Sequence, residues 1–284
     1  MKDIQTFVNQ NLKLYSLPDI YINLKRVIDD PNSSLVDAVN VISHDPAMTM
    51  RILRIVNSAF FGFGQKIETV QHALNMMGMQ ELHDLVLASS VTTTAFNDIS
   101  SDLMDMRAFW RKSIYCGVLS RLIANHCNVL DSDRLFVAGL LADIGHLVMY
   151  DKLSADMDFI LRNRSSQHKS MAQLEKEVIG FDYSEVGYAL MRKWKLPSGL
   201  QMVVRHHPFP ASASSYELNV AIVHIAMVIS TSENAITDEL FNKIDSSTLR
   251  LSSLNIDDLK SIQQDAVDQL SGAEALLCHY DKAV

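Results

Sequence analysis

The stretch DPAMTMRILRIVNSAFF, from Asp45 to Phe61, decides the fold class because its apolar residues recur at the spacing of an α-helix. The residues that lie three or four positions apart on one helical face are Met48, Ile52, Ile55, Val56 and Ala59. Arg51 and Arg54 fall on the other side of the same helix. Asp45 predicts the N-cap, with Pro46 at the first helical position. The stretch therefore predicts one amphipathic helix.

Similar starts recur along the chain. Helix-start residues precede four other segments of helical periodicity, and they are Leu17-Pro18, Ser34, Thr69 and Leu196-Pro197. Breakers at residues 30–33 and 62–64 have the length of loops in a compact helical bundle. No segment shows the alternation of a strand. We predict an all-α fold, organised as a two-lobed helical bundle.

The composition indicates a globular protein that does not bind nucleic acid. The chain has 284 residues, 48% of them hydrophobic, which is enough to bury one large core or two lobes. Its net charge is -8, whereas neutralising phosphates requires clustered lysines and arginines. The basic pairs at 25–26, 111–112 and 192–193 are scattered and predict solvated helix faces.

Cysteine usage and hydropathy predict a cytoplasmic protein without a membrane segment. Cys116, Cys127 and Cys278 are too few and too distant for a disulfide framework or a cysteine-based zinc site. The first ten residues, MKDIQTFVNQ, lack the apolar core of a secretion signal. The apolar run 219–230 is well short of the roughly 20 residues that a membrane helix needs, so it predicts a core helix.

Two changes in composition suggest domain boundaries. A polar stretch, 97–105, precedes a predicted long helix through Trp110 and Tyr115. From Glu233 onward, ten acidic residues stand against four basic ones. We therefore predict an N-terminal lobe at 1–102, a second lobe at 103–231 and an acidic helical appendage at 232–284.

The stretch GLLADIGH, residues 139–146, places an acid inside a predicted apolar helix. A buried carboxylate is costly unless it is paired, hydrogen-bonded or bound to a metal, so Asp143 requires a partner. A histidine directly before such an aspartate would indicate a pair of metal ligands, but here the preceding residue is Ala142.

Several motifs follow one another along the chain in a recognisable order. The first is SHDPAMTMRILRIVNSAFFGFGQKIETVQHALNMMGMQEL, and FWRKS, VAGLLADIGHLVMY and GFDYSEVGYALMRKWKLPSGLQMVVRHHP follow it. The first motif resembles the first half of the HD-related output domain (HDOD) family of bacterial signalling proteins, and the other three resemble its second half. The resemblance covers residues 14–210, and it implies that the second lobe is a degenerate form of the bundle found in HD-domain metal phosphohydrolases.

The resemblance to those enzymes implies a set of metal-ligand positions. In this chain these positions carry Lys112, Ala142, Asp143, Tyr183, His206 with His207, and Met227. A lysine repels a metal ion, and a tyrosine with a pKa near 10 is a poor ligand at neutral pH. In a shifted register, Tyr115, Cys116 or His126 would stand near the first position and His224 near the last.

A hydrolytic site needs three or more protein ligands with an open position, so the sequence predicts a vacated pocket without metal, cofactor or catalytic residue. The remnant ligand positions are Asp143, His206 and His207. We expect the Asp143 carboxylate to accept hydrogen bonds from Lys112, from Tyr183 or from one of the two histidines. His146 is expected to end or cap a helix contact and not to bind a ligand.

A second candidate site is the corner that follows the helix at 45–56. Asn57, Ser58, Phe61 and Phe63 lie beside glycines at 62 and 64, which could present the aromatic rings to a partner. The alternative is that Asn57 and Ser58 end the helix while the aromatic rings fill the core.

The sequence thus predicts a non-catalytic regulatory protein of bacterial signal transduction that acts through contacts with signalling proteins not identified by the sequence. No receiver, cyclase or phosphodiesterase domain is recognisable, and neither is a nucleophile elbow or a phosphate-binding loop. One alternative is a metal-dependent phosphohydrolase that acts on nucleotides or cyclic dinucleotides. Another is a sensor that holds a phosphate or carboxylate in the vacated pocket.

Overall fold

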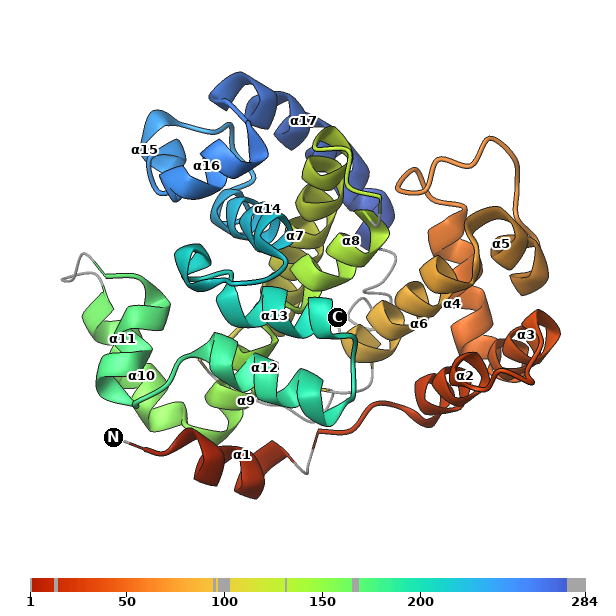
Figure 1. The fold of residues 1–284 in the computed structure, drawn as a ribbon, viewed down its shortest axis with the longest axis horizontal. Helices are drawn as coiled ribbons and strands as arrows, with labels where there is room; N and C mark the ends of the chain where they lie inside the picture. Colours follow the sequence, from red (N-terminus) through yellow and green to blue (C-terminus); the bar gives the residue numbers. More distant parts are fainter. Residues whose placement is uncertain are drawn as a thin grey trace. The chain divides into compact units, whose positions relative to one another are not determined.

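The computed structural model describes residues 2–12, 15–93, 96, 103–130, 132–164 and 169–274, and every regular element within them is a helix (Figure 1). No strand occurs in these residues, as the all-α prediction requires. Within the same ranges, no helix combines the length and apolar character needed to cross a membrane. Cys278, most of the polar stretch 97–105 and the end of the acidic appendage lie outside the described residues.

The contacts within the chain divide it into two compact units. Unit 1 comprises residues 1–16 and 98–264, and unit 2 comprises 17–97 and 265–284. The change of unit after residue 97 falls within the polar stretch that suggested the first boundary. No change of unit occurs near residue 231, so the first part of the predicted appendage belongs to unit 1.

Unit 2 is built from five consecutive helices and the end of a sixth. The five are α2 (Asp19–Asp29), α3 (Leu35–Ser43), α4 (Pro46–Val56), α5 (Val70–Met77) and α6 (Met79–Thr93). The predicted apolar face of α4 is buried, since Met48, Ile52, Ile55 and Val56 are at most 3% exposed. Ala59, expected on that face, is exposed because α4 ends at Val56.

The predicted helix starts are confirmed. The Ser34 hydroxyl accepts from the Asp37 amide at 3.3 Å, and the Asp37 carboxylate accepts from the Ser34 amide at 2.8 Å. Asp45 caps α4 by accepting from the Met48 amide at 2.9 Å, and Thr69 caps α5 in the same way. The two prolines at 18 and 197 each stand directly before a helix, α2 and α13. Local side-chain chemistry therefore sets these boundaries.

Unit 1 contains the remaining helices, and α7 is the longest of those described. They are α1 (Ile4–Asn11), α7 (Met106–His126), α8 (Ser132–Leu141), α9 (Ile144–Lys152), α10 (Ser154–Asn163), α11 (Met171–Val178), α12 (Tyr183–Lys193), α13 (Ser198–His206), the 3₁₀ helix η3 (Pro210–Ser212), α14 (Glu217–Ile229), α15 (Asp238–Phe241) and α16 (Ser246–Ser252). The helix α14 packs against α7 and supplies the predicted core helix, with Val220, Ile222 and Ile225 fully buried.

The acidic segment after residue 231 is tied into unit 1 by side-chain contacts. Gln263, on α17 (Ile256–Ala273), accepts from the Ile236 amide at 2.9 Å and donates to the Asn234 carbonyl at 2.9 Å. Glu233 accepts from Arg111 of α7 at 2.7 Å and 2.9 Å. The change from unit 1 to unit 2 falls within α17, after residue 264.

Candidate functional site

Asp143 occupies a break between two helices rather than the interior of one. The predicted single helix through residues 139–146 is wrong, because α8 ends at Leu141 and α9 begins at Ile144. A turn closes the break, in which the Ala142 amide donates to the Gly139 carbonyl at 3.3 Å. Asp143 is the N-cap residue of α9, and only 5% of it is exposed. The break turns its carboxylate into the interior of unit 1.

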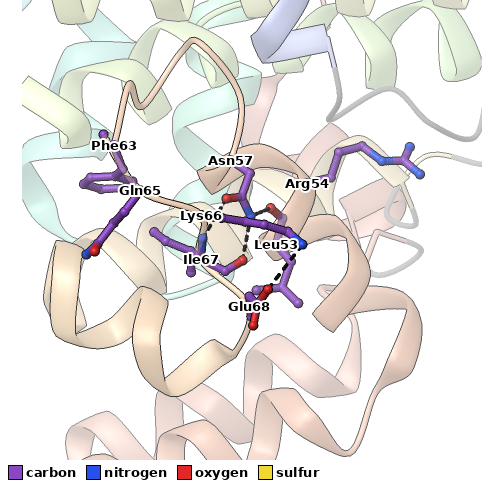
Figure 2. Close-up of a pocket in the computed structure, with 9 residues that line it drawn as sticks. Leu53, Arg54, Asn57, Phe63, Gln65, Lys66, Ile67 and Glu68 are labelled. Carbon is purple, nitrogen blue, oxygen red and sulfur yellow. Dashed lines mark hydrogen bonds and ion pairs between the residues drawn. The ribbon is translucent and has the colours of Figure 1, made fainter.

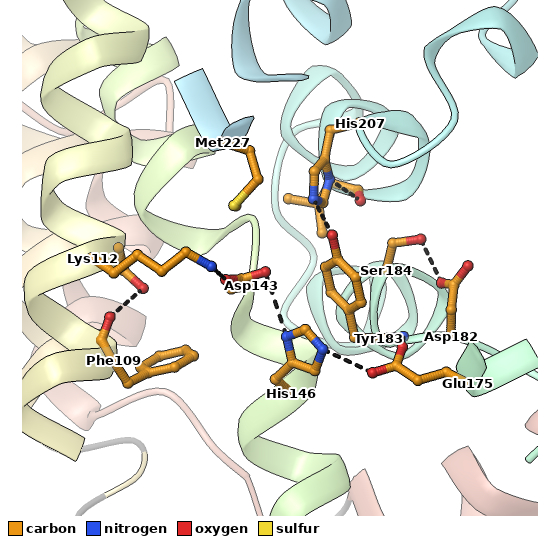
Figure 3. A network of polar contacts seen from close by, with 12 residues as sticks. Phe109, Lys112, Asp143, His146, Glu175, Asp182, Tyr183, Ser184, His207 and Met227 are labelled. Carbon is orange, nitrogen blue, oxygen red and sulfur yellow. Dashed lines mark hydrogen bonds and ion pairs between the residues drawn. The ribbon is translucent and has the colours of Figure 1, made fainter. Parts of the chain in front are cut away.

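Lys112 of α7 is the direct partner of Asp143. Its Nζ atom donates to Oδ2 of Asp143 at 2.6 Å (Figure 3). Burial alone would raise the pKa of Asp143, but the Lys112 ammonium and the contact with His146 hold that pKa well below its usual range. Asp143 is therefore ionised, and of the donors expected from the sequence it is Lys112 that bonds to it.

His146 connects Asp143 to a second buried carboxylate. Its Nδ1 atom lies 3.4 Å from Oδ1 of Asp143, and its Nε2 atom lies 2.8 Å from Oε1 of Glu175 on α11. Burial lowers the pKa of His146, yet the two carboxylates outweigh this effect and raise it to about 9. The expectation that His146 ends or caps a helix contact is wrong, since it lies in the first turn of α9 and links two acids.

The charges alternate along this row of side chains. Their order is Lys112, Asp143, His146 and Glu175, so each cation is followed by an anion (Figure 3). Glu175 is completely buried, and its Oε2 atom accepts from the Tyr183 amide at 2.9 Å. Each buried charge thus has an opposite charge within contact distance, which offsets part of its desolvation cost.

Tyr183 and His207 form the neutral end of the site. The Tyr183 ring stacks on the His146 ring with centroids 4.0 Å apart. The Nδ1 atom of His207 lies 2.8 Å from the Val204 carbonyl, which only accepts, so Nδ1 carries the proton. The Nε2 atom therefore accepts from the Tyr183 hydroxyl at 2.9 Å. Burial lowers the pKa of His207 to about 4, which keeps the ring neutral.

The other expected pocket residues divide between the interior and the surface. Met227 of α14 points its thioether toward the Lys112–Asp143 pair (Figure 3). His206 is partly exposed, and its Nδ1 atom lies 2.8 Å from the Ser212 hydroxyl, so its ring bonds outside this row. Ala142 is fully buried but brings no polar side chain.

Glu175 is the main residue that the sequence analysis missed. It stands in the charged stretch QLEKEV, which reads as a solvated helix. A finer pattern was present, because Ala172, Glu175 and Ile179 are three and four positions apart, and all three are buried. An acid on the buried face of a short amphipathic helix is the signal that could have identified it.

The arrangement does not fit a bound metal ion. A metal takes lone pairs from converging ligands, whereas the Asp143 oxygens face an ammonium and an imidazole that carries protons on both nitrogens. In the described ranges no group of three or more His, Cys, Asp or Glu side chains is placed to hold a metal. Chemically, the row is suited to holding α7, α9, α11, α12 and α13 together.

The two shifted histidines predict a bell-shaped dependence of stability on pH. His146 binds its proton more tightly in the folded protein, so its contribution is complete below pH 6.5 and is lost as the pH rises toward 9. His207 stays neutral when folded, so stability falls as the pH drops from 6.5 toward 4. Thermal unfolding should therefore occur at the highest temperature near pH 6.5.

The alkaline side provides the cleaner measurement, because carboxylates also contribute on the acid side. An NMR titration should show the His146 ring losing its proton near pH 9. His44, which is exposed, serves as a control, and His44→Gln should keep the alkaline decline. A His146 ring that titrates near 6.5 in the folded protein would contradict the prediction.

The corner at residues 57–67 is held in shape by Asn57 (Figure 2). The Asn57 side chain accepts from the Ile67 amide at 2.8 Å and donates to the Ile67 and Leu53 carbonyls at 2.7 Å each. The Ser58 hydroxyl donates to the Ile55 carbonyl at 2.6 Å. Asn57 thus closes the loop, whereas the Ser58 hydroxyl bonds back to the end of α4.

The aromatic residues of the corner differ in burial. Phe60 is buried, whereas Phe61 and Phe63 are half-buried and stack with centroids 5.8 Å apart. Gly62 has a φ of +61°, a conformation that other residues rarely adopt, and this turn separates the two rings along the chain. Phe63 lines an open depression of about 780 Å³ together with Arg54 and Lys66 (Figure 2).

A comparison with protein-family models identifies the domain. The model of the HDOD domain matches residues 14–210. Among curated proteins, an uncharacterized protein of Treponema pallidum (strain Nichols) is 24% identical over 218 residues, which cover 74% of this chain and 40% of that protein. The chain thus spans well under half the length of this relative.

Solved structures share the fold at low sequence identity. A protein from Shewanella amazonensis SB2B, provisionally named a phosphohydrolase, is 23% identical with a TM-score of 0.77, covering 95% of this chain and 98% of its own. An HDOD domain protein of unknown function from Geobacter sulfurreducens is 19% identical with a TM-score of 0.73, and the coverage is 95% and 99%. A protein from Marinobacter aquaeolei VT8, provisionally named a signal transduction protein, is 16% identical with a TM-score of 0.68, over 95% and 60%.

Proposed function

Because this chain belongs to the HDOD domain family, we propose that it is a non-catalytic regulatory protein that acts in cytoplasmic signal transduction through protein contacts. The observation that carries the proposal is the ion pair between Lys112 and Asp143, 2.6 Å long. It places a cation where the resemblance to HD-domain enzymes puts a metal. The Asp143 carboxylate, which would bind the metal in such an enzyme, instead pairs with Lys112 and so links α7 to the break before α9.

The alternative from another class is a metal-dependent phosphohydrolase, and the provisional name of the Shewanella protein favours it. Binding a metal at Asp143 would require Lys112 to leave or to lose its proton. The pKa of Lys112 is raised, because the attraction of Asp143 outweighs the effect of burial. The ammonium is thus stabilised in place, and we favour regulation over hydrolysis.

The contact surface that we propose is the corner at residues 57–67. Phe61 and Phe63 are both half-buried, and Phe63 lines the depression beside Arg54 and Lys66. Aromatic residues of this kind are enriched in protein interfaces. The rival surface, the acidic segment after 231, is partly committed to other contacts, because Glu233 and Gln263 bond within unit 1. We therefore assign the partner contact to the corner, and we expect the partner to be another signalling protein.

The proposal is tested by two assays on the same purified protein and its variants. In the first, the protein is incubated with Mn²⁺ or Fe²⁺, and metal content and hydrolysis of bis(p-nitrophenyl) phosphate and of a cyclic dinucleotide are measured. We expect no stoichiometric metal and no hydrolysis above that of Asp143→Asn. One metal per chain together with hydrolysis that is lost in Asp143→Asn would establish the enzyme instead.

In the second assay, variants replace the wild-type protein in a deletion strain and signalling output is measured. Phe63→Ser should abolish the output while the purified variant stays folded. Phe159→Ser is the matched control, because Phe159 is 56% exposed on α10 and far along the chain from the corner, and it should keep the output. Full output from a folded Phe63→Ser protein would refute the assignment of the contact to the corner.

A further inference from the structure

A second depression lies in unit 1 between α1, α12 and α13, and it is lined by basic and aromatic side chains. Its volume is about 430 Å³, which lies within the usual range of small-molecule sites, about 300–1,000 Å³. Arg192 and Tyr188 come from α12, Arg205 from α13, and Ile4 and Val8 from α1. This groove shares no residue with the buried row around Asp143.

The two arginines are arranged around one aromatic ring. The Arg205 guanidinium lies 4.5 Å from the centre of the Tyr188 ring, and that of Arg192 lies 5.7 Å from it. In the described part of the chain, neither guanidinium forms a salt bridge with a carboxylate. Both guanidinium groups therefore approach the same ring, and an anion bound by both would offset the repulsion between their charges.

Glu185, the one acid that lines the groove, already has partners within the chain. Glu185 belongs to the capping box of α12, in which its Oε2 atom accepts from the Asp182 amide at 3.2 Å. The same oxygen lies 3.8 Å from the Lys176 ammonium. Glu185 is therefore oriented toward the helix start and toward another cation. The groove thus keeps an excess of positive charge, with Arg192, Lys193 and Arg205 against one acid.

This local charge is opposite to that of the whole protein, which is -8. A negatively charged protein repels extended polyanions such as nucleic acid, whereas a confined basic groove still binds a small anion. Guanidinium groups bind phosphate oxygens in a bidentate manner, so two of them suit a phosphate with two charges. Ile4, Val8 and Ala189 supply an apolar wall for the organic part of such a ligand.

We propose that the groove between α1, α12 and α13 is a binding site for a small phosphorylated organic molecule, with Arg192 and Arg205 holding the phosphate. Such a ligand would bridge three helices of unit 1, and binding to the folded state alone would stabilise them. The site would give the regulatory protein a chemical input. It does not depend on the proposed protein contacts, because its residues belong to neither the corner nor the buried row.

The test uses AMP as the probe and the full chain, with binding measured by calorimetry at low salt. We expect AMP to bind, adenosine not to bind, and inorganic phosphate to bind more weakly than AMP because it lacks contact with the apolar wall. Arg192→Gln and Arg205→Gln should each weaken AMP binding about 10-fold or more, the loss typical of one charge-assisted hydrogen-bond partner. Arg205→Lys should restore part of the affinity that Arg205→Gln loses.

Arg162→Gln is the control, because Arg162 is an exposed arginine of α10 outside the groove and should leave AMP binding unchanged. The proposal fails if the folded protein binds neither AMP nor phosphate at about 10 mM, an affinity too weak for a built site. It also fails if both Gln variants bind AMP as the parent does. AMP and phosphate binding with equal affinity would refute the organic part of the assignment.

Discussion

The Glu175→Ala variant should unfold more easily than the parent by about 3 kcal/mol at pH 7, because it removes one of the two carboxylates that face the buried His146 cation. Glu175 is completely buried, and its two oxygens accept from the His146 ring and from the Tyr183 amide. Removing the carboxylate leaves both donors unsatisfied in the interior. Chemical denaturation followed by circular dichroism measures the change.

A neighbouring acid on the same helix provides the control. Glu177 pairs with Lys169 at 2.7 Å, but its side chain is 52% exposed. Exposed ion pairs contribute about 1 kcal/mol or less, so Glu177→Ala should be nearly neutral. Equal effects of the two substitutions would show that burial of Glu175 is not what stabilises the site.

The pH dependence of the same variant separates the charge from simple packing. Above pH 9 the His146 ring loses its proton in the parent, so Glu175 no longer faces a cation there. The difference in stability between parent and Glu175→Ala should therefore shrink as the pH rises from 7 to 10. A difference that stays constant over this range would assign the loss to the cavity alone.

The helices could be predicted from the sequence because their signals are local. Ser34, Asp45 and Thr69 each cap a helix by bonding an amide three positions along the chain, and the prolines at 18 and 197 act through their own backbone geometry. The apolar face of α4 follows from spacing within a single element. A few neighbouring residues are therefore enough to predict where such a helix begins and which face it buries.

The candidate site could be predicted only in part because its contacts are distant in sequence. Burial made it clear that Asp143 needs a partner, and the resemblance brought Lys112 into consideration. The choice of Lys112 over Tyr183 depends on the packing of α7 against the break before α9, 31 residues away. The spacing around Glu175 could have indicated its burial, but nothing near it in the sequence identifies His146, 29 residues earlier, as its partner.

The corner at 57–67 shows the same division between local and distant information. The turn at Gly62 could be inferred from the sequence, and its φ of +61° agrees. The two bonds between the Asn57 side chain and the Ile67 backbone close the loop 58–66 and could not be inferred from spacing. These bonds give Phe61 and Phe63 a fixed setting, which is why we place the partner contact there.

Gly145→Ala should be as damaging as the loss of Glu175, although it adds only a methyl group. A Cβ atom at Gly145 would lie 1.9 Å from the carbonyl oxygen of Tyr183 and 2.8 Å from the Gly187 amide nitrogen. Both atoms belong to the backbone of α12, so no side chain can rotate to make room. The helices α9 and α12 must separate, and overpacking of this kind costs about 3 kcal/mol.

The separation should also disturb the buried row, because Gly145 is adjacent to His146 and approaches Tyr183. The 4.0 Å stack of the two rings depends on the close approach of α9 to α12. We therefore expect the pKa of His146 in Gly145→Ala to fall from about 9 toward its ordinary value, because separation and entering water weaken the attraction of Asp143 and Glu175 for the ring's proton. An NMR titration of the folded variant measures this shift beside its unfolding free energy.

Gly64→Ala is the matched control for that substitution. No heavy atom lies within 4 Å of a Cβ atom built on Gly64, and its φ is not positive, so alanine fits without strain. Its effect on the unfolding free energy should stay within about 0.5 kcal/mol, the usual range for surface positions. If Gly145→Ala is equally mild and keeps the His146 pKa near 9, then close packing of α9 against α12 at Gly145 is not required for stability or for the site. Gly145 would then have no part in building the site.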